Sequence, residues 1–155
     1  MLIHLLMPGV LLSLCVMAHA LVVTVLLRQL SRSAGQTWLR FWSITWVLIR
    51  VASWMVAAHL VEIAIWASFF AWHQMFPDIE TAFYFSAVTY TTVGYGDLVL
   101  PPKWRLIAGV EGLTGILMCG WSTGFLFAVV SRMYSALSTG PGASARSNAP
   151  GEPSS

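Results

Sequence analysis

The residues best suited to chemistry form one short run, residues 91–97, with the sequence TTVGYGD. Its two glycines, Gly94 and Gly96, alternate with larger residues, and glycine adopts a positive φ without strain. A backbone that alternates in handedness turns successive carbonyl oxygens toward one axis. Such oxygens replace the water shell of a cation, so the run predicts a cation site built from the backbone. The predicted ligands come from Thr92, Val93, Gly94, Tyr95 and Gly96.

One such strand cannot surround an ion, because it approaches the ion from one side only. Four copies closed about an axis can, and closed symmetry is the usual way to build such a ring. Irregular backbone at membrane depth is tolerated only where it lines a water-filled cavity or is buried in protein. The run therefore predicts a homotetramer whose axis passes along residues 92–96.

The composition places the chain in lipid. Of its 155 residues, 57% are hydrophobic and 9% are charged, whereas soluble domains carry roughly 25% charged residues. So few charges cannot cover a soluble domain with polar surface. The formal net charge of +2 gives no support for nucleic acid as a partner. We expect a membrane protein whose partners are lipid, ions and further copies of itself.

Three long apolar segments are predicted to cross the membrane, since each reaches the roughly 20 residues that a spanning helix needs. Ala18-His19-Ala20 has the form of a signal-peptide cleavage site, but the apolar run continues past it and no basic residue precedes it. We therefore expect a retained helix. The predicted helices are Leu2–Leu27, Ile44–Trp72 and Trp104–Met133.

The segment between the second and third apolar stretches, residues 76–102, is too polar and too rich in glycine and proline to span. Within it, Glu80–Thr91 has the length of a short helix, with Asp78 as its N-cap and an acidic residue in its first turn. Its C-terminal end, which carries partial negative charge, would point toward the cation site.

These segments predict an all-α membrane protein with three transmembrane helices per subunit, a re-entrant pore helix and a filter loop. Residues 1–30 form an additional N-terminal transmembrane helix. Residues 31–137 form a pore domain, and residues 138–155 form a disordered cytoplasmic tail rich in Ser, Gly, Ala and Pro.

The basic residues predict the orientation, because cytoplasmic loops carry an excess of Lys and Arg. They concentrate after the first and third segments, which places the N-terminus outside and the C-terminus in the cytoplasm. We expect a multi-pass protein of the cell's inner (plasma) membrane. We also expect Trp38 to about Trp46 to lie along the inner interface as an amphipathic stretch, with Arg50 near the boundary. The basic residues concerned are Arg28, Arg32, Arg40, Arg132 and Arg146.

From Ser43 to Tyr134 the sequence resembles the tetrameric potassium channels, in particular the small bacterial type with two core helices per subunit. The resemblance rests on residues 91–97, which we call the filter loop. The sequence TVGYG within this loop matches the potassium filter sequence of that family. The resemblance implies an outer helix, a pore helix, the filter and an inner helix. It implies potassium as the permeant ligand, without a cofactor, held at Thr92, Val93, Gly94 and Tyr95.

The same resemblance implies supporting residues. Thr91 and Asp97 flank the filter, and Tyr84, thirteen residues before Asp97, is the expected hydrogen-bond partner of that carboxylate on the pore helix. Inner helices of the family often bend at a glycine below the filter, and Gly115 or Gly120 matches that place. Small residues also permit close helix packing, which is the alternative reading of these glycines.

Two features depart from the family pattern. The first helix is additional to the two-helix core and has no arginine ladder, so no dedicated voltage sensor is expected; we expect this helix to lie outside the pore. The tail after the third helix is too short for a cytoplasmic ligand-binding domain. Gating is then intrinsic, or it responds to pH, lipid or a partner.

Carboxyl groups at membrane depth are functional candidates because they are costly there. Glu62 lies near the middle of the second helix, with His59 one turn before it, and Glu111 lies in the outer half of the third helix. These three are our candidates for pH sensitivity. The alternative is that either acid is neutral and hydrogen-bonded to a neighbouring hydroxyl.

Other functions receive less support. A weakly selective cation channel or a non-conducting membrane subunit is the main alternative. An enzyme would need a nucleophile with its base or a metal cluster, and no such spacing occurs, since the histidines His4, His19, His59 and His73 are dispersed. The two cysteines, Cys15 and Cys119, are expected to be small buried apolar side chains rather than a disulfide.

Overall fold

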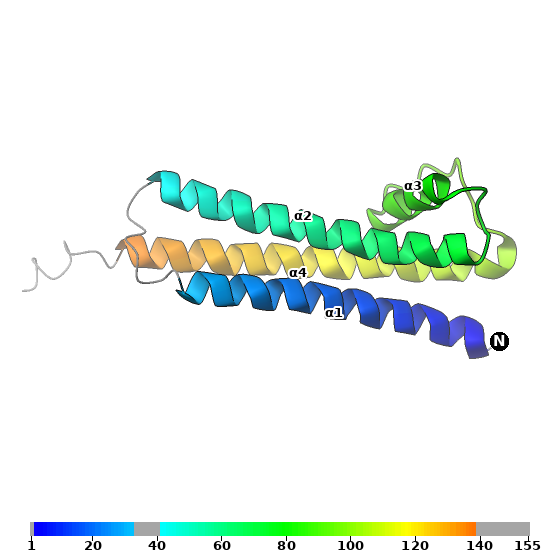
Figure 1. Ribbon diagram of the computed structural model, residues 1–155, viewed down its shortest axis with the longest axis horizontal. Helices are drawn as coiled ribbons and strands as arrows, with labels where there is room; N and C mark the ends of the chain where they lie inside the picture. The colour runs from blue at the N-terminus through cyan, green and yellow to red at the C-terminus, as the bar shows by residue number, and fades with distance from the viewer. Residues whose placement is uncertain (1, 33–40, 139–155) are drawn as a thin grey trace, which may run out of the picture.

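The computed structural model describes residues 2–32 and 41–138, and these residues form helices and no strand (Figure 1). The predicted stretch 38–40 and the predicted tail after Ser138 lie outside the described residues. The all-α fold is confirmed. The elements are α1 (Leu2–Arg32), α2 (Phe41–Trp72), α3 (Ile79–Tyr90), a 3-10 turn η1 (Pro102–Trp104) and α4 (Arg105–Ser138).

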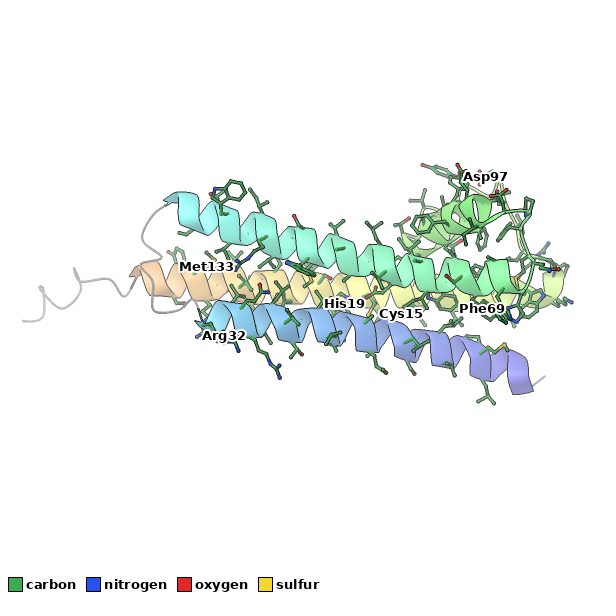
Figure 2. The ribbon with its side chains drawn as sticks, viewed as in Figure 1. Cys15, His19, Arg32, Phe69, Asp97 and Met133 are labelled. Atoms are coloured by element: carbon green, nitrogen blue, oxygen red, sulfur yellow. The ribbon has the colours of Figure 1, made fainter. Side chains whose placement is uncertain are left out.

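The three long helices lie side by side, and each is long and apolar enough to cross a membrane: Leu6–Arg32, Ile44–Trp72 and Pro102–Ser135. The N-terminus, α3 and the filter loop lie at one end of this bundle. The other end holds the C-terminal ends of α1 and α4 and the start of α2. Figure 2 shows the same division, with Asp97 beside α3 and with Arg32 and Met133 at the opposite end. The chain is therefore a multi-pass membrane protein.

Two helices run further than the hydrophobic segments predicted. α1 continues to Arg32 rather than Leu27, and α4 continues to Ser138 rather than Met133. Hydropathy predicts only the part of a helix that lipid surrounds. Backbone hydrogen bonds continue past that part, so the helix itself is longer. In α1, Arg32 also occupies the last turn, where a cation interacts favourably with the helix dipole.

The start of α2 lies within the predicted interfacial stretch. Residues 41–46 belong to one unbroken helix that continues to Trp72, and their place at the interface stays a prediction. The reason is local, because residues 41–72 contain neither glycine nor proline that would break the helix.

Two clusters of buried apolar side chains hold the bundle together. One lies toward the filter loop, and the other lies toward the opposite end. α1 contributes to both, and it packs against α2 and α4. α3 also packs against α2 and α4, but not against α1. The clusters include Cys15, Trp66, Phe70, Phe85, Tyr90 and Met118, and, in the second, Val23, Leu26, Val51, Phe125 and Val129.

Candidate functional site

α3 begins at a side-chain cap. Asp78 has extended backbone, and its carboxylate accepts hydrogen bonds from the Thr81 backbone N–H at 2.7 Å and the Thr81 hydroxyl at 3.0 Å. These donors hold the pKa of Asp78 below its usual value, because they stabilise the charged form. The predicted N-cap is confirmed, and the helix ends at Tyr90, immediately before the filter loop.

The filter loop alternates in backbone handedness. Thr92 has φ 61°, Gly94 has φ 56° and Gly96 has φ 77°. The two glycines were expected in this region; the threonine was not, because β-branched residues rarely adopt it. Apart from Gln74, Thr92 is the one non-glycine with positive φ among the described residues. The alternation therefore covers the whole segment from Thr92 to Gly96.

Backbone hydrogen bonds to the last turn of α3 hold this conformation. The Thr92 N–H donates to the Thr89 carbonyl at 3.0 Å. The Val88 carbonyl accepts from the N–H groups of Val93 and Gly94 at 3.0 and 3.2 Å. The position of the filter loop is thus tied to the position of the C-terminal turn of α3.

The glycines are needed for their backbone angles rather than for space. A Cβ added at Gly94 or Gly96 would meet no atom of this chain within 4 Å. Their positive φ, however, is one that L side chains rarely adopt.

Side chains tie both ends of the filter loop to α3. The Thr91 hydroxyl donates to the Ala87 carbonyl at 2.6 Å. The Tyr84 hydroxyl donates to Asp97 Oδ2 at 2.8 Å, which is the contact that the family resemblance implied. This bond to a carboxylate raises the pKa of Tyr84, because ionisation would place two negative charges together.

A glycine of α4 lies against the end of α3. A Cβ on Gly115 would lie 1.8 Å from the Tyr90 carbonyl oxygen, so no larger residue fits there without movement. At Gly120 a Cβ would meet nothing within 4 Å. α4 runs unbroken through both positions. The close contact explains Gly115 in this conformation, and the gating hinge at Gly115 or Gly120 stays a prediction.

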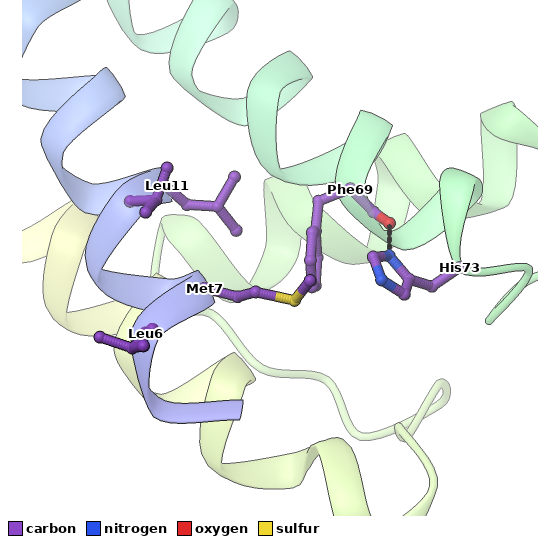
Figure 3. Close-up of a pocket in the computed structure, with 6 residues that line it drawn as sticks. Leu6, Met7, Leu11, Phe69 and His73 are labelled. Atoms are coloured by element: carbon purple, nitrogen blue, oxygen red, sulfur yellow. Dashed lines mark hydrogen bonds between the residues drawn. The ribbon is translucent and has the colours of Figure 1, made fainter. Parts of the chain in front are cut away.

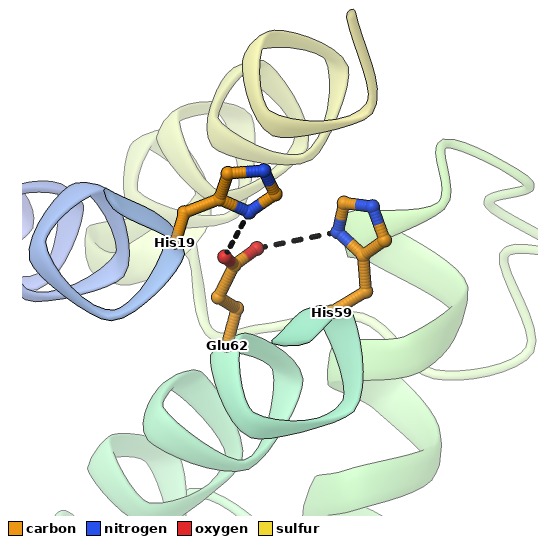
Figure 4. Close-up of side chains that lie close together, drawn as sticks. All are labelled: His19, His59 and Glu62. Carbon is orange, nitrogen blue, oxygen red and sulfur yellow. Dashed lines mark hydrogen bonds and ion pairs between the residues drawn. The ribbon is translucent and has the colours of Figure 1, made fainter. Parts of the chain in front are cut away.

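A buried polar cluster lies between the helices, formed by His19, His59, Glu62, Tyr90 and Ser122. His19 Nδ1 lies 2.8 Å from Glu62 Oε1, and His59 Nδ1 lies 3.3 Å from Glu62 Oε2 (Figure 4). The Tyr90 hydroxyl donates to Glu62 Oε2 and lies 3.0 Å from His59 Nδ1.

The cluster is closed on its other side by α4. The Ser122 hydroxyl lies 3.2 Å from His19 Nε2 and 3.0 Å from His59 Nε2. His19 and Glu62 are completely buried. The cluster therefore joins α1, α2, α3 and α4 through hydrogen bonds.

The predicted pairing of His59 with Glu62 is present, but the expectation of dispersed histidines is wrong for His19 and His59. The fold brings them to ring centroids 5.5 Å apart. Sequence reasoning missed His19, and the signal available was a titratable residue within an apolar helix. It also missed Tyr90 and Ser122, which carry no such signal.

His19, His59 and Glu62 each offer an atom that a metal accepts, and these atoms lie within 4.8 Å of one another. Each of the three side chains already makes hydrogen bonds inside the cluster. The nitrogen and oxygen atoms that a metal ion would bind are therefore engaged in hydrogen bonds within the cluster.

Glu111 is buried elsewhere, in α4, and neither of its carboxyl oxygens makes a well-formed hydrogen bond. The buried side chain of Ser86, on α3, lies beside the Glu111 carboxyl group. Glu111 thus adjoins α3 and not the polar cluster, and its pH sensitivity stays a prediction. Of the two free cysteines, Cys15 is buried as expected, whereas Cys119 is exposed on the single chain, so the expected burial is wrong there.

A pocket between the start of α1 and the end of α2 contains no predicted site residue (Figure 3). His73 borders it, and its Nδ1 donates to the Phe69 carbonyl of the same helix at 2.9 Å. The remaining side chains are apolar, so the pocket offers no convergent polar groups for a ligand. They are Leu6, Met7, Val10, Leu11 and Phe69.

Comparison with known proteins places this geometry in context. Residues 58–132, slightly less than half of the chain, match the model of a protein family described as an ion channel. The matched segment begins within α2 and includes α3, the filter loop and most of α4, whereas α1 lies before it. No curated protein and no solved structure matches the chain. The match indicates an ion channel rather than an enzyme, and hence an oligomer that passes ions across a membrane.

Proposed function

We propose that the chain is the subunit of a potassium-selective channel that conducts passively through a homotetrameric pore. The alternating backbone of the filter loop carries this proposal, with positive φ at Thr92, Gly94 and Gly96. That alternation suits a row of carbonyl oxygens along one axis, and the sequence TVGYG matches the potassium filter. Potassium would be held by Thr92, Val93, Gly94 and Tyr95.

The single chain supports a fourfold assembly in two ways. It contains one filter loop, which supplies only one side of an ion site. Val93 and Tyr95, whose side chains would face away from the axis, are 52% and 72% exposed on the single chain. Neighbouring subunits would cover these apolar surfaces, and four filter loops would close the ring.

The supporting residues have a physical task in this proposal. The hydrogen bonds of Thr91 to α3 and of Tyr84 to Asp97 resist displacement of either end of the filter loop. A filter that keeps its shape replaces the hydration shell of potassium at low cost, and it offers a smaller ion a poorer match. Tyr84, Thr91 and Asp97 are thus positioning residues for the carbonyl ligands.

The proposed orientation follows the basic residues. Arg28, Arg32 and Arg132 lie near the end of the bundle remote from the filter loop. That end would face the cytoplasm by the positive-inside rule. The filter loop and the N-terminus would face outward across the plasma membrane.

Flux from liposomes tests the function directly. The purified protein should carry potassium down a gradient much faster than sodium, with protein-free liposomes as the control. Equal fluxes of the two ions would instead support the weakly selective cation channel. Absence of flux from correctly inserted tetramers would support a non-conducting subunit.

A further inference from the structure

The contacts within the polar cluster need more hydrogens than its side chains carry when both histidines are neutral and Glu62 is ionised. Six contacts join its members: Glu62 to each of His19, His59 and Tyr90, Ser122 to each of the two histidines, and His59 Nδ1 to the Tyr90 hydroxyl. The single hydrogen on His59 Nδ1 serves its contacts with both Glu62 and Tyr90, so the six contacts need five hydrogens. Two neutral imidazoles, one serine and one tyrosine supply four, and an ionised carboxylate supplies none. One further proton completes the network.

The same proton balances the charge. Glu62 as a carboxylate would leave one negative charge completely buried, which is costly at membrane depth. With the additional proton the cluster is neutral overall, whichever of its atoms holds it. Met55 Sδ also lies 3.4 Å from the Ser122 hydroxyl. Sulfur is a weaker acceptor than an imidazole nitrogen, so Ser122 donates its hydrogen to a histidine.

The cluster contacts Tyr90, which is the last residue before the filter loop. Tyr90 is the last residue of α3, and its carbonyl rests against Gly115 of α4. The carbonyls of Val88 and Thr89, in the same turn, hold the N–H groups of residues 92–94. A change in the hydrogen bond between Tyr90 and Glu62 therefore reaches the filter loop through a single helical turn.

We propose that His19, His59 and Glu62 share one exchangeable proton, and that this proton makes His19 on α1 a positioning residue for the filter. The proposal rests on the proposed channel function. With the proton bound, all six contacts are made. When rising pH removes it, one contact between Ser122 and a histidine loses its hydrogen and the buried site becomes negative. The bond from Tyr90 to Glu62 then becomes charge-assisted while α4 loses a bond to the cluster, so the end of α3 shifts relative to α4 and conduction falls.

Other ionisable groups lie near the cluster, namely Cys15 on α1 and Cys119 on α4, with Glu111 further along α4. Ordinary pKa values do not separate these groups, because burial shifts the pKa of thiols and carboxyls. A step in conduction is assigned to the cluster by its loss in His19→Gln, a substitution that leaves Cys15, Cys119 and Glu111 in place.

The first test compares potassium flux between about pH 5 and 9 for the unmutated tetramer, His19→Gln and His73→Gln. The glutamine at position 19 keeps hydrogen-bonding groups but cannot hold the exchangeable proton. His73→Gln is the matched control, because His73 hydrogen-bonds within its own helix and, among the described residues, makes no contact with the cluster. The unmutated protein and His73→Gln should lose flux as pH rises, and His19→Gln should lack this step while still preferring potassium to sodium.

A second readout separates positioning from simple stability. Potassium that binds the folded tetramer raises its Tm relative to sodium, by an amount that depends on its affinity. His19→Gln should reduce this potassium-dependent rise. A purely structural role would lower the Tm equally in both salts. Ser122→Ala tests the same network without altering an ionisable group. It replaces His19→Gln in both measurements if that variant does not fold.

The outcomes distinguish the two proposals. An unmutated protein without potassium preference would overturn the channel function, and with it this inference. A potassium-selective protein whose pH profile and potassium-dependent Tm rise are unchanged by His19→Gln or Ser122→Ala would overturn the shared proton alone.

Discussion

Gly94 and Gly109 are both glycines with open space around them, yet they differ in backbone angle. Gly94 has φ 56°, whereas Gly109 lies in the regular helix α4, and an added Cβ meets nothing within 4 Å at either. Gly94→Ala places a Cβ in the left-handed region, at a cost of about 1–2 kcal/mol, and should reshape the carbonyl row. We expect loss of the potassium preference, measured as the ratio of potassium to sodium flux.

Gly109→Ala is the control for that substitution and should retain the preference, since alanine favours a helix. If both variants select potassium as well as the unmutated protein, the backbone angle at Gly94 does not set selectivity.

Asp78 predicts a pH dependence of stability. Its pKa is lowered in the folded protein by donors at the start of α3, so its contribution is present above the ordinary aspartate pKa. That contribution disappears as pH falls through the folded value. The Tm of the unmutated protein should therefore fall more steeply in acid than that of Asp78→Asn, which keeps a neutral cap. Parallel curves would show that the charge of the cap is unimportant.

At the scale of elements, the contact between α3 and α4 depends on Gly115. Gly115→Ala would bring a Cβ to 1.8 Å from the Tyr90 carbonyl oxygen, so the helices must separate. Overpacking of this kind costs about 1–3 kcal/mol. We expect a lower Tm and a weaker potassium preference, because Tyr90 leads into the filter loop. Gly120→Ala, where the space is open, should change neither; an unaltered Tm in Gly115→Ala would refute the close contact.

α1 is expected to lie outside the ion path, because it packs on α2 and α4 and has no packing contact with α3. Deletion of residues 1–29 should leave a potassium-selective pore, since α3 and the filter loop remain supported by α2 and α4. Stability should drop, because the deletion removes buried side chains of both apolar clusters. The pH step should also disappear with His19. Loss of selectivity in a well-folded truncation would contradict this division of roles.

At the scale of the whole molecule, we expect four subunits and twelve spanning helices, three from each chain. Native mass measurement in detergent should give a tetramer, and crosslinking should stop at four subunits. A molecule of only two chains would supply two filter loops. A population of dimers that conducts potassium selectively would therefore exclude the fourfold pore.

The sequence by itself determined the features that depend on neighbouring residues. The length of each apolar run located the three spanning helices, and Asp78 marked the start of α3. The positive φ of Gly94 and Gly96 follows from glycine's lack of a Cβ. Each of these depends on local backbone preference or on transfer into lipid, which can be evaluated along the chain.

Only the tertiary structure decided which faces of the helices meet. A helix that is apolar on all sides carries no stripe to indicate its inward face, so its rotation is set by packing against other helices. That packing brought His19 to Glu62, placed Gly115 against Tyr90 and left Cys119 exposed. These contacts join residues far apart in the chain, and no local preference encodes them.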